Sequence, residues 1–188
     1  MNDANVSAVL GLITDMQPRE PYMLSIDGRC AAGKTTLAAK LSAYLSCAVV
    51  HIDDFYLPFA LRTPERMAKP GGNIDFERLK NEIILPLKSG SDAVYRPYAC
   101  HENRFLPSVT LSAAKSTIVE GSYSCHPCLA DMLGIKVFMD IAPDKQLSRI
   151  ALRDQGHVEA FRTMWIPREE FYFAECAVRE RCDMVLMN

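Results

Sequence analysis

The segment that most constrains this chain is GRCAAGKTT, which runs from Gly28 to Thr36. It matches the phosphate-binding pattern GxxxxGK[ST], and a chance match in a chain of ordinary composition is expected on the order of once in a hundred cases or more rarely. Residues 22–27 precede it as a short apolar strand, and residues 35–46 follow it with apolar side chains on one helical face. This succession of strand, glycine turn and helix is the setting in which such a loop binds an anion.

The chemistry of the segment follows from its residue types. Its glycines let the main chain curl, so that successive amides and the amino end of the next helix point at one anion. Lys34 is expected to reach the terminal phosphates of a nucleotide, and the Thr35 hydroxyl to bind a magnesium ion that bridges two of them. The alternative is a tight strand-to-helix turn with an incidental lysine. The predicted phosphate-binding residues are Gly28, Arg29, Cys30, Ala31, Ala32, Gly33, Lys34, Thr35 and Thr36.

Strands and helices alternate along almost the whole chain. Short apolar runs predict buried strands at residues 22–27, 48–52, 117–120, 135–140 and 184–187. Apolar positions at helical spacing predict helices at residues 6–16, 35–46, 75–88, 143–154 and 167–179. We therefore expect an α/β fold of the P-loop NTPase type, with a doubly wound, mainly parallel five-stranded sheet, helices on both faces and a small hairpin and lid appendage. Residues 94–98 and 109–112 are expected to form the hairpin.

Composition places the chain among ordinary globular proteins and argues against two kinds of partner. Hydrophobic residues make up 49% and charged residues 23%, which excludes disordered, collagenous and coiled-coil classes. The 21 Lys and Arg against 23 Asp and Glu leave no broad basic surface for a nucleic acid. No apolar run approaches the roughly 20 residues that span a bilayer. We expect a single kinase domain over residues 1–188, with neither a nucleic-acid partner nor a membrane partner, and leave a homodimer open.

The cysteines indicate a reducing compartment. Seven cysteines, an odd number, are scattered along the chain, and the amino terminus lacks the basic and apolar stretches of a signal peptide, so we expect a cytoplasmic protein. Cys125 and Cys128 form a lone CxxC motif. A zinc ion there would need distant ligands such as Cys100 or His101, and ordinary reduced cysteines are the alternative.

Two carboxylates are expected beside the phosphate loop. Glu120 ends the apolar run in TIVEG, at a strand end where a second acidic group can hold the magnesium ion through water. Asp53 follows the strand in HIDDFYLP and is expected to orient or deprotonate the hydroxyl of an acceptor. The alternative is that Asp53 or Asp54 only caps the following turn.

Arginines are the expected source of the positive charge that phosphoryl transfer needs when the site closes. Arg149 and Arg153 lie one turn apart on the predicted helix at residues 143–154 and are predicted to be catalytic. Together with Arg162 and Arg168 they are expected to form a lid over approximately residues 149–168. The alternative is a solvated arginine face.

Six segments in order are similar to the uridine kinase branch of the uridine kinase and phosphoribulokinase superfamily: GRCAAGKTT, HIDDFYLP, GGNIDFERL, YRPYACHENRF, TIVEGSYSCHP and QLSRIALRD. The resemblance covers nearly the whole chain after the first helix. It implies ATP with magnesium as the donor and a small hydroxyl-bearing metabolite as the acceptor, with a substrate-side insertion over approximately residues 56–112.

The resemblance also implies roles for single residues. Asp53 matches the family's catalytic aspartate, Glu120 its acidic residue near the metal, and Arg149 and Arg153 its lid helix. Tyr98 falls on the hairpin where uridine kinases place an aromatic ring against the nucleobase. Asp75 matches a sugar-binding aspartate by position, and a helix cap is its alternative role. The predicted acceptor-binding residues are Asp53, Tyr56, Asp75, Tyr98, His101 and Arg162.

The sequence leaves three functions open. The first is a kinase that transfers the terminal phosphoryl group of ATP to a nucleoside. The second is a kinase for another small acceptor, such as nicotinamide riboside, pantothenate, glycerate or ribulose phosphate. The third is an ATP-binding regulator that hydrolyses nucleotide slowly and acts through a partner. The chain contains no guanine-reading NKxD motif, which disfavours a GTPase.

Overall fold

The computed structural model describes residues 3–130 and 132–188, and it is built around one parallel sheet. The sheet has five strands in the order β2-β7-β1-β8-β9, and every neighbouring pair is parallel. The strands are β1 (Met23–Gly28), β2 (Ala48–His51), β7 (Thr117–Glu120), β8 (Ile135–Asp140) and β9 (Met184–Met187). The predicted five-stranded parallel sheet is confirmed, and its strand ends differ from the predicted ones by a residue at most.

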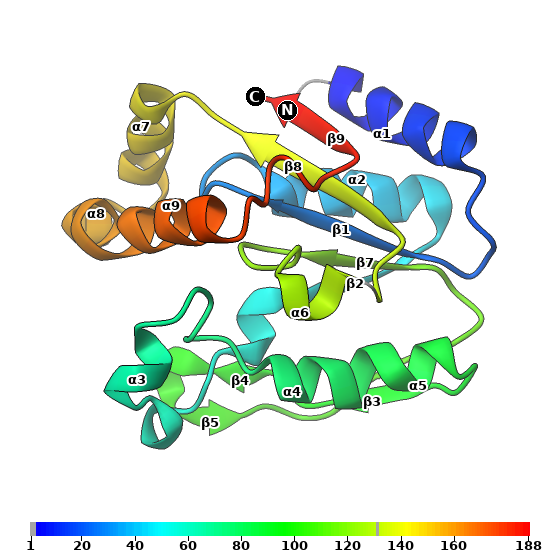
Figure 1. Ribbon diagram of the computed structural model, residues 1–188, viewed down its shortest axis with the longest axis horizontal. Helices are drawn as coiled ribbons and strands as arrows, with labels where there is room; N and C mark the ends of the chain where they lie inside the picture. The colour runs from blue at the N-terminus through cyan, green and yellow to red at the C-terminus, as the bar shows by residue number, and fades with distance from the viewer. Residues whose placement is uncertain (1–2, 131) are drawn as a thin grey trace.

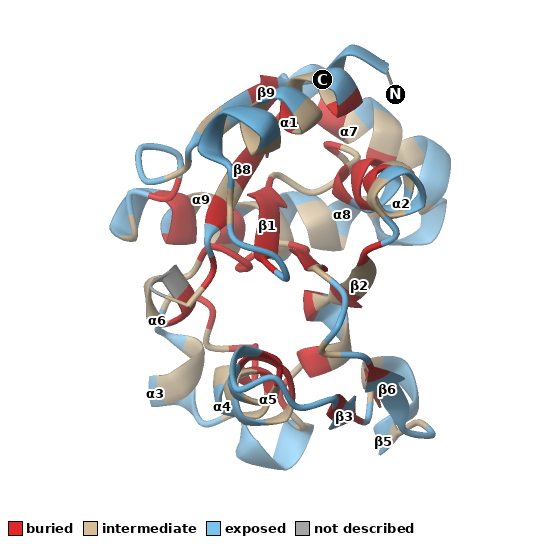
Figure 2. Cartoon of the chain, turned by 90° about the vertical axis from the view of Figure 1, so that its right-hand side faces the viewer, coloured by how far each residue is buried: buried red, intermediate tan, exposed pale blue. Residues whose placement is uncertain are grey.

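Helices cover both faces of the sheet, as expected for a doubly wound fold. On one face lie α1 (Asp3–Met16) and α2 (Lys34–Leu45). On the other lie α9 (Ile166–Glu175) and a continuous helix made of α4 (Phe76–Arg78), the π-helical segment η3 (Leu79–Ile84) and α5 (Leu85–Lys88) (Figure 1). Because successive side chains of a strand point to opposite faces, neighbouring residues enter different cores. On β8, for example, Val137 packs with α2, whereas Phe138 packs with α9. Figure 2 shows the buried residues along β1 and β8 and on the inner side of α2.

The segment predicted to be a substrate-side insertion forms a small module beside the sheet. After the 3-10 turn η1 (Ile52–Phe55) come the short helices η2 (Phe59–Leu61) and α3 (Pro64–Met67), and then the α4–α5 helix. The predicted hairpin is present as two pairs of strands, β3 (Ala93–Tyr95) with β6 (Val109–Leu111) and β4 (Tyr98–Ala99) with β5 (Arg104–Phe105), with the 3-10 turn η4 (Cys100–Glu102) at its tip. The predicted strand at 94–98 divides at Pro97, which has no N–H to donate.

The predicted lid region, residues 149–168, is more helical than its sequence suggested. Behind α7 (Pro143–Arg153) follow η5 (Gln155–His157), α8 (Val158–Ala160) and the π-helical segment η6 (Phe161–Trp165), which runs into α9. Pro167 lies just beyond η6, as Pro86 lies just beyond η3. A proline removes one donor and clashes with the carbonyl one turn earlier, and a wider turn relieves both problems. The helix predicted at 167–179 therefore begins earlier and ends at Glu175.

The turn after β1 depends on glycine. Gly28 has a φ of +126°, and a Cβ atom there would lie 2.0 Å from the carbonyl oxygen of Met139 on β8. Any side chain would push the two strands apart, so only glycine fits where the main chain leaves β1. In the part of the chain that the structure describes, no helix combines the length and the apolar character needed to cross a membrane.

Candidate active site

A cleft of about 930 Å³ opens at the carboxyl ends of the strands. In the sheet register Glu120 at the end of β7 lies between Ile26 of β1 and His51 of β2, so the phosphate loop, Glu120 and the residues after β2 reach the same edge. This is the edge at which parallel α/β sheets bind their ligands. The predicted residues that line the cleft are Cys30, Ala31, Gly33, Lys34, Thr35, Thr36, Asp53, Tyr56, His101, Glu120, Arg149 and Arg153.

Lys34 is held against its own loop. Its Nζ donates to the carbonyl oxygens of Gly28 at 2.6 Å and Arg29 at 3.0 Å, and it lies 3.3 Å from the Oγ of Ser122. The side chain is buried beneath the loop, 9% exposed, with its charge at the base of the cleft. A cation in this place neutralises a phosphate that lies above the loop, and its role in catalysis stays a prediction.

Glu120 and Thr35 form a pair suited to magnesium. The Thr35 hydroxyl donates to Oε1 of Glu120 at 3.0 Å, and Nδ1 of His51 lies 2.5 Å from the same oxygen. The hydrogen bond to Glu120 raises the pKa of His51. Magnesium prefers oxygen ligands and is bound through one or two protein groups together with phosphate oxygens and water. A hydroxyl and a carboxylate beside the phosphate loop fit that chemistry.

Asp53 opens onto the cleft from η1. The pKa of its carboxyl is raised, chiefly because the walls of the cleft displace water from around it, and the charge of Lys34 opposes that rise. A raised pKa is the direction expected for a carboxylate that takes a proton from a hydroxyl. Asp54 has a different surrounding, because its Oδ2 accepts a hydrogen bond of 3.1 Å from the Tyr95 hydroxyl in the insertion module. Of the two aspartates, Asp53 is the one that lines the cleft.

Asp27, which the sequence analysis did not select, holds the base of the site together. It is completely buried, and its carboxylate accepts hydrogen bonds from the amides of Gly28 (2.6 Å), Tyr123 (3.2 Å) and Cys125 (2.8 Å) and from the Tyr172 hydroxyl (2.8 Å). These donors come from the phosphate loop, the loop after β7 and α9. Burial raises the pKa of Asp27, and the hydrogen bonds from Cys125, Tyr172 and Gly28, together with the charge of Lys34, oppose that rise by stabilising the carboxylate. In the sequence, the signal that could have identified Asp27 is the presence of an acidic residue in an otherwise apolar strand.

Two consecutive carboxylates of α9 hold the phosphate loop from the lid side. Oε2 of Glu169 accepts a hydrogen bond of 2.9 Å from the Cys30 amide, and its Oε1 accepts one from the Ser122 hydroxyl. Glu170 forms an ion pair with Arg29 at 2.6 Å. The predicted phosphate contact of Arg29 therefore does not involve its guanidinium, which is directed at acidic side chains. Glu169 is 5% exposed and puts a negative charge in the wall of the cleft.

Replacing Glu169 by glutamine is expected to strengthen the binding of inorganic tripolyphosphate by about threefold to tenfold. The glutamine keeps an oxygen that can accept from the Cys30 amide but removes a charge that would face the bound phosphates. Titration calorimetry measures the affinity, and Glu175→Gln, an exposed change near the end of the same helix, is the matched control. Unchanged or weaker binding in the Glu169 variant would mean that its charge is needed to shape the loop.

Two of the four predicted lid arginines, Arg149 and Arg153, line the cleft. Arg149 donates from Nη1 to the carbonyl oxygen of Ala31 at 3.1 Å and from Nη2 to Oδ1 of Asn188 at 3.3 Å. The Arg153 guanidinium lies over the Phe161 ring, 5.7 Å from its centre. Both cations come from the last two turns of α7, as their spacing predicted, and their catalytic roles stay predictions.

Three predicted acceptor-binding residues do not line the cleft. Asp75 is the N-cap of α4, where its Oδ1 accepts a hydrogen bond of 3.2 Å from the Arg78 amide. Tyr98 is 4% exposed, packs on Phe105 with ring centres 5.3 Å apart, and hydrogen-bonds through its hydroxyl to Asn103. Arg162 is an exposed residue of η6. These three side chains lie outside the lining of the cleft, and their predicted substrate contacts stay predictions.

The Cys125 and Cys128 motif is not assembled as a zinc site. Cys128 has its Sγ 3.0 Å from Nδ1 of His126, whereas the Sγ of Cys125 faces Ser25 at 3.1 Å and Cys182 at 3.8 Å. Within residues 3–130 and 132–188, no three His, Cys, Asp or Glu side chains form a group that could hold a metal ion. The two cysteines point at different neighbours.

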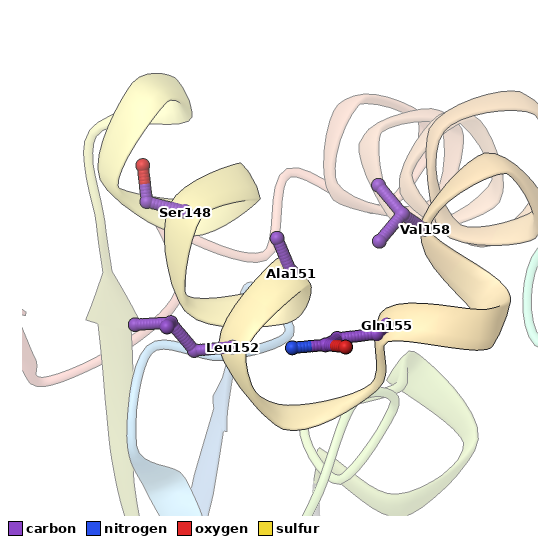
Figure 3. Close-up of a pocket in the computed structure, with 5 residues that line it drawn as sticks. All are labelled: Ser148, Ala151, Leu152, Gln155 and Val158. Carbon is purple, nitrogen blue, oxygen red and sulfur yellow. The ribbon is translucent and has the colours of Figure 1, made fainter.

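A second hollow lies outside the cleft, between α7 and α8 (Figure 3). Leu152, which is 82% exposed, and Val158 give it an apolar surface. The hollow is lined by Ser148, Ala151, Leu152, Gln155 and Val158. None of these side chains is ionisable, so the groups suited to phosphate chemistry are those of the larger cleft.

Comparison with known proteins shows which proteins the chain resembles. No family model matches the chain. It is 29% identical to the uridine kinase of Saccharomyces cerevisiae over 148 residues, which cover 71% of this chain and 29% of that protein. It is 27% identical to uridine-cytidine kinase B of Dictyostelium discoideum over 145 residues, which cover 72% of this chain and 59% of that protein. The chain thus spans less than two thirds of the length of either relative.

A solved structure shares the fold along almost the whole chain. A possible uridine kinase from Bacillus stearothermophilus superimposes with a TM-score of 0.73 over 96% of both chains, at 20% sequence identity. The parallel five-stranded sheet, the phosphate loop after β1 and these similarities lead to one conclusion. The chain has the P-loop NTPase fold, and over about 70% of its length its sequence is similar to those of uridine kinases.

Proposed function

We propose that this chain is an ATP-dependent kinase that transfers a phosphoryl group to a hydroxyl of a small metabolite, most directly a nucleoside. The observation that carries the proposal is the convergence of Lys34, the Thr35 and Glu120 pair, and Asp53 on one cleft. A cation, a set of magnesium ligands and a candidate base are what phosphoryl transfer requires of a protein. The similarity to uridine kinases supports a nucleoside as the acceptor.

In this proposal each residue has a defined task. Thr35 and Glu120 would hold magnesium, which when bound neutralises charge on the terminal phosphates. Asp53 orients the acceptor hydroxyl and takes its proton as the oxygen attacks the phosphorus atom. Lys34 and the lid arginines stabilise the charge that gathers on the transferred group, and the lid helices exclude water from it.

A second candidate is a kinase for another hydroxyl-bearing acceptor, which the position of Tyr98 favours. Because Tyr98 packs on Phe105 inside the hairpin, it is not available to stack on a nucleobase. A base would instead have to use Tyr56 and Trp165, which line the cleft with their ring centres 6.3 Å apart. Acceptors with a smaller or non-aromatic group need no such platform.

The deciding experiment is an acceptor screen with ATP and magnesium, in which ADP formation is measured. Nucleosides, nicotinamide riboside, pantothenate, glycerate and ribulose phosphate are supplied one at a time. We expect ADP release that depends on a nucleoside, and the Asp53→Asn variant serves as the blank. Turnover that depends on one of the other acceptors would select the second candidate. Slow turnover that ignores every acceptor would indicate the nucleotide-binding regulator.

A further inference from the structure

A pair of cysteines lies in contact outside the nucleotide cleft. The Sγ atoms of Cys125 and Cys182 are 3.8 Å apart, although the two residues are separated by 57 positions in the chain. Cys125 belongs to the loop after β7, and Cys182 to the turn that leads into β9. Neither residue lines the cleft or takes part in the proposed phosphoryl transfer.

The backbone of Cys125 and the residue that follows Cys182 are both hydrogen-bonded to residues of the sheet. The Cys125 amide donates to Oδ2 of Asp27 at 2.8 Å. On the other side, the Asp183 amide donates to the carbonyl oxygen of Lys136, and the Lys136 amide donates to the Asp183 carboxylate at 2.7 Å. Since β1 and β8 are neighbours, these bonds hold the two thiols in contact. A disulfide needs the sulfurs to approach to about 2.05 Å, a movement that side-chain rotation and a small shift of the turn can supply.

The two thiols differ in access to solvent. Cys182 is half-buried and reaches the surface, whereas Cys125 is 7% exposed and is enclosed by Ser25 and Cys182. The hydrogen bond from Cys182 and the burial of the sulfur raise the pKa of Cys125, so its thiol is slow to react with an oxidant from solution. A reagent from solution therefore meets Cys182 first.

We propose that Cys125 and Cys182 are an oxidation site that forms a reversible disulfide when the protein meets a hydroperoxide. In the first step hydrogen peroxide oxidises the Cys182 thiol to a sulfenic acid, and its other oxygen leaves as water. In the second step the sulfur of Cys125 attacks the sulfur of Cys182, the S–S bond forms, and the hydroxyl of the sulfenic acid leaves with the Cys125 proton as a second water molecule. A dithiol reductant returns both thiols.

The test uses intact-mass measurement and peptide mapping of the full chain, before and after brief treatment with hydrogen peroxide. We expect the mass to fall by two hydrogen atoms and a cross-linked peptide pair containing Cys125 and Cys182 to appear. Both changes are expected to disappear after incubation with dithiothreitol. Thiol titration of the denatured product is expected to show five of the seven cysteines free.

Matched variants make the result decisive. Cys182→Ser changes a half-buried side chain and is expected to abolish the mass loss, and Cys125→Ser is expected to do the same. Cys176→Ser changes another half-buried cysteine near α9 and is expected to leave the cross-link intact. A mass loss that persists in Cys182→Ser, or a wild-type protein that only gains oxygen atoms, would overturn the proposal. Neither readout depends on kinase activity, so the proposal stands or falls separately from the proposed function.

Discussion

Replacing Lys34 by alanine is expected to lower acceptor-dependent ADP formation by about a hundredfold or more. The Lys34 ammonium is buried under the phosphate loop, where no other side chain of the loop carries a free positive charge, since the Arg29 guanidinium is paired with Asp140 and Glu170. Without Lys34, the negative charge that gathers on the transferred phosphoryl group is no longer stabilised by this nearby cation. Initial rates with ATP and magnesium, and nucleotide affinity from calorimetry, measure the two parts of the loss.

The fold should survive this change, which separates a catalytic role from a structural one. The hydrogen bonds that alanine removes all originate from the Lys34 Nζ, so the loop loses one donor group and none of its main-chain bonds. Lys40→Ala, which removes a half-exposed lysine from the same helix, is the control. Near-normal turnover in the Lys34 variant, with an unchanged melting temperature, would refute the assignment of the phosphate loop.

The parts of the site that the sequence predicts are those carried by local patterns. The loop around Gly28 and Lys34 is defined by spacing over a few residues, and its strand and helix are defined by periodicity. Glu120 and Asp53 follow apolar runs, and parallel pairing brings strand ends to one edge of the sheet. The apolar runs themselves predict the five strands almost to the residue, and the central strands β1, β7 and β8 read as continuous apolar segments because they are buried on both faces.

The parts that the sequence does not predict depend on contacts between distant segments. The Cys30 amide and Glu169 are 139 positions apart, and neither the spacing nor the composition of α9 distinguishes Glu169 from the other acidic residues of that helix. Asn188 is similar, since its side-chain amide donates to the carbonyl oxygen of Ala32 from the position just after β9. Such contacts are set by how the layers pack, and a periodic pattern records only which face of an element is buried.

Tyr98 shows how a motif can be located while the direction of its side chain is not predicted. Its position on the hairpin follows from the segment YRPYACHENRF, but Pro97 interrupts the strand and η4 tightens the tip. The ring then packs against Phe105 across the short β4–β5 pair instead of facing the cleft. The direction of a side chain on a two-residue strand depends on that local pairing, which residue order alone does not set.

Replacing Asp53 by asparagine is expected to lower turnover by about a hundredfold or more while ATP affinity stays within about threefold of the wild-type value. Asparagine has nearly the same size but cannot take a proton from the acceptor hydroxyl. Because the walls of the cleft raise the pKa of Asp53, the wild-type rate is expected to fall as the pH drops through a pKa above the ordinary aspartate value of about 3.9. Above that pKa the carboxylate is ionised and the rate levels off, and the variant should lack this acidic limb.

Asp54→Asn is the control that makes the Asp53 result specific. It changes the neighbouring carboxylate, whose hydrogen bond to Tyr95 ties it to the insertion module, so we expect a loss of stability and only a modest loss of turnover. The two variants differ by one position along η1, and the pH profile distinguishes them, because only loss of the base removes the acidic limb. If Asp54→Asn abolished turnover and Asp53→Asn did not, the proton would have to be taken by Asp54 after a rearrangement of η1. The proposed function would then have to be argued from a different set of active-site groups.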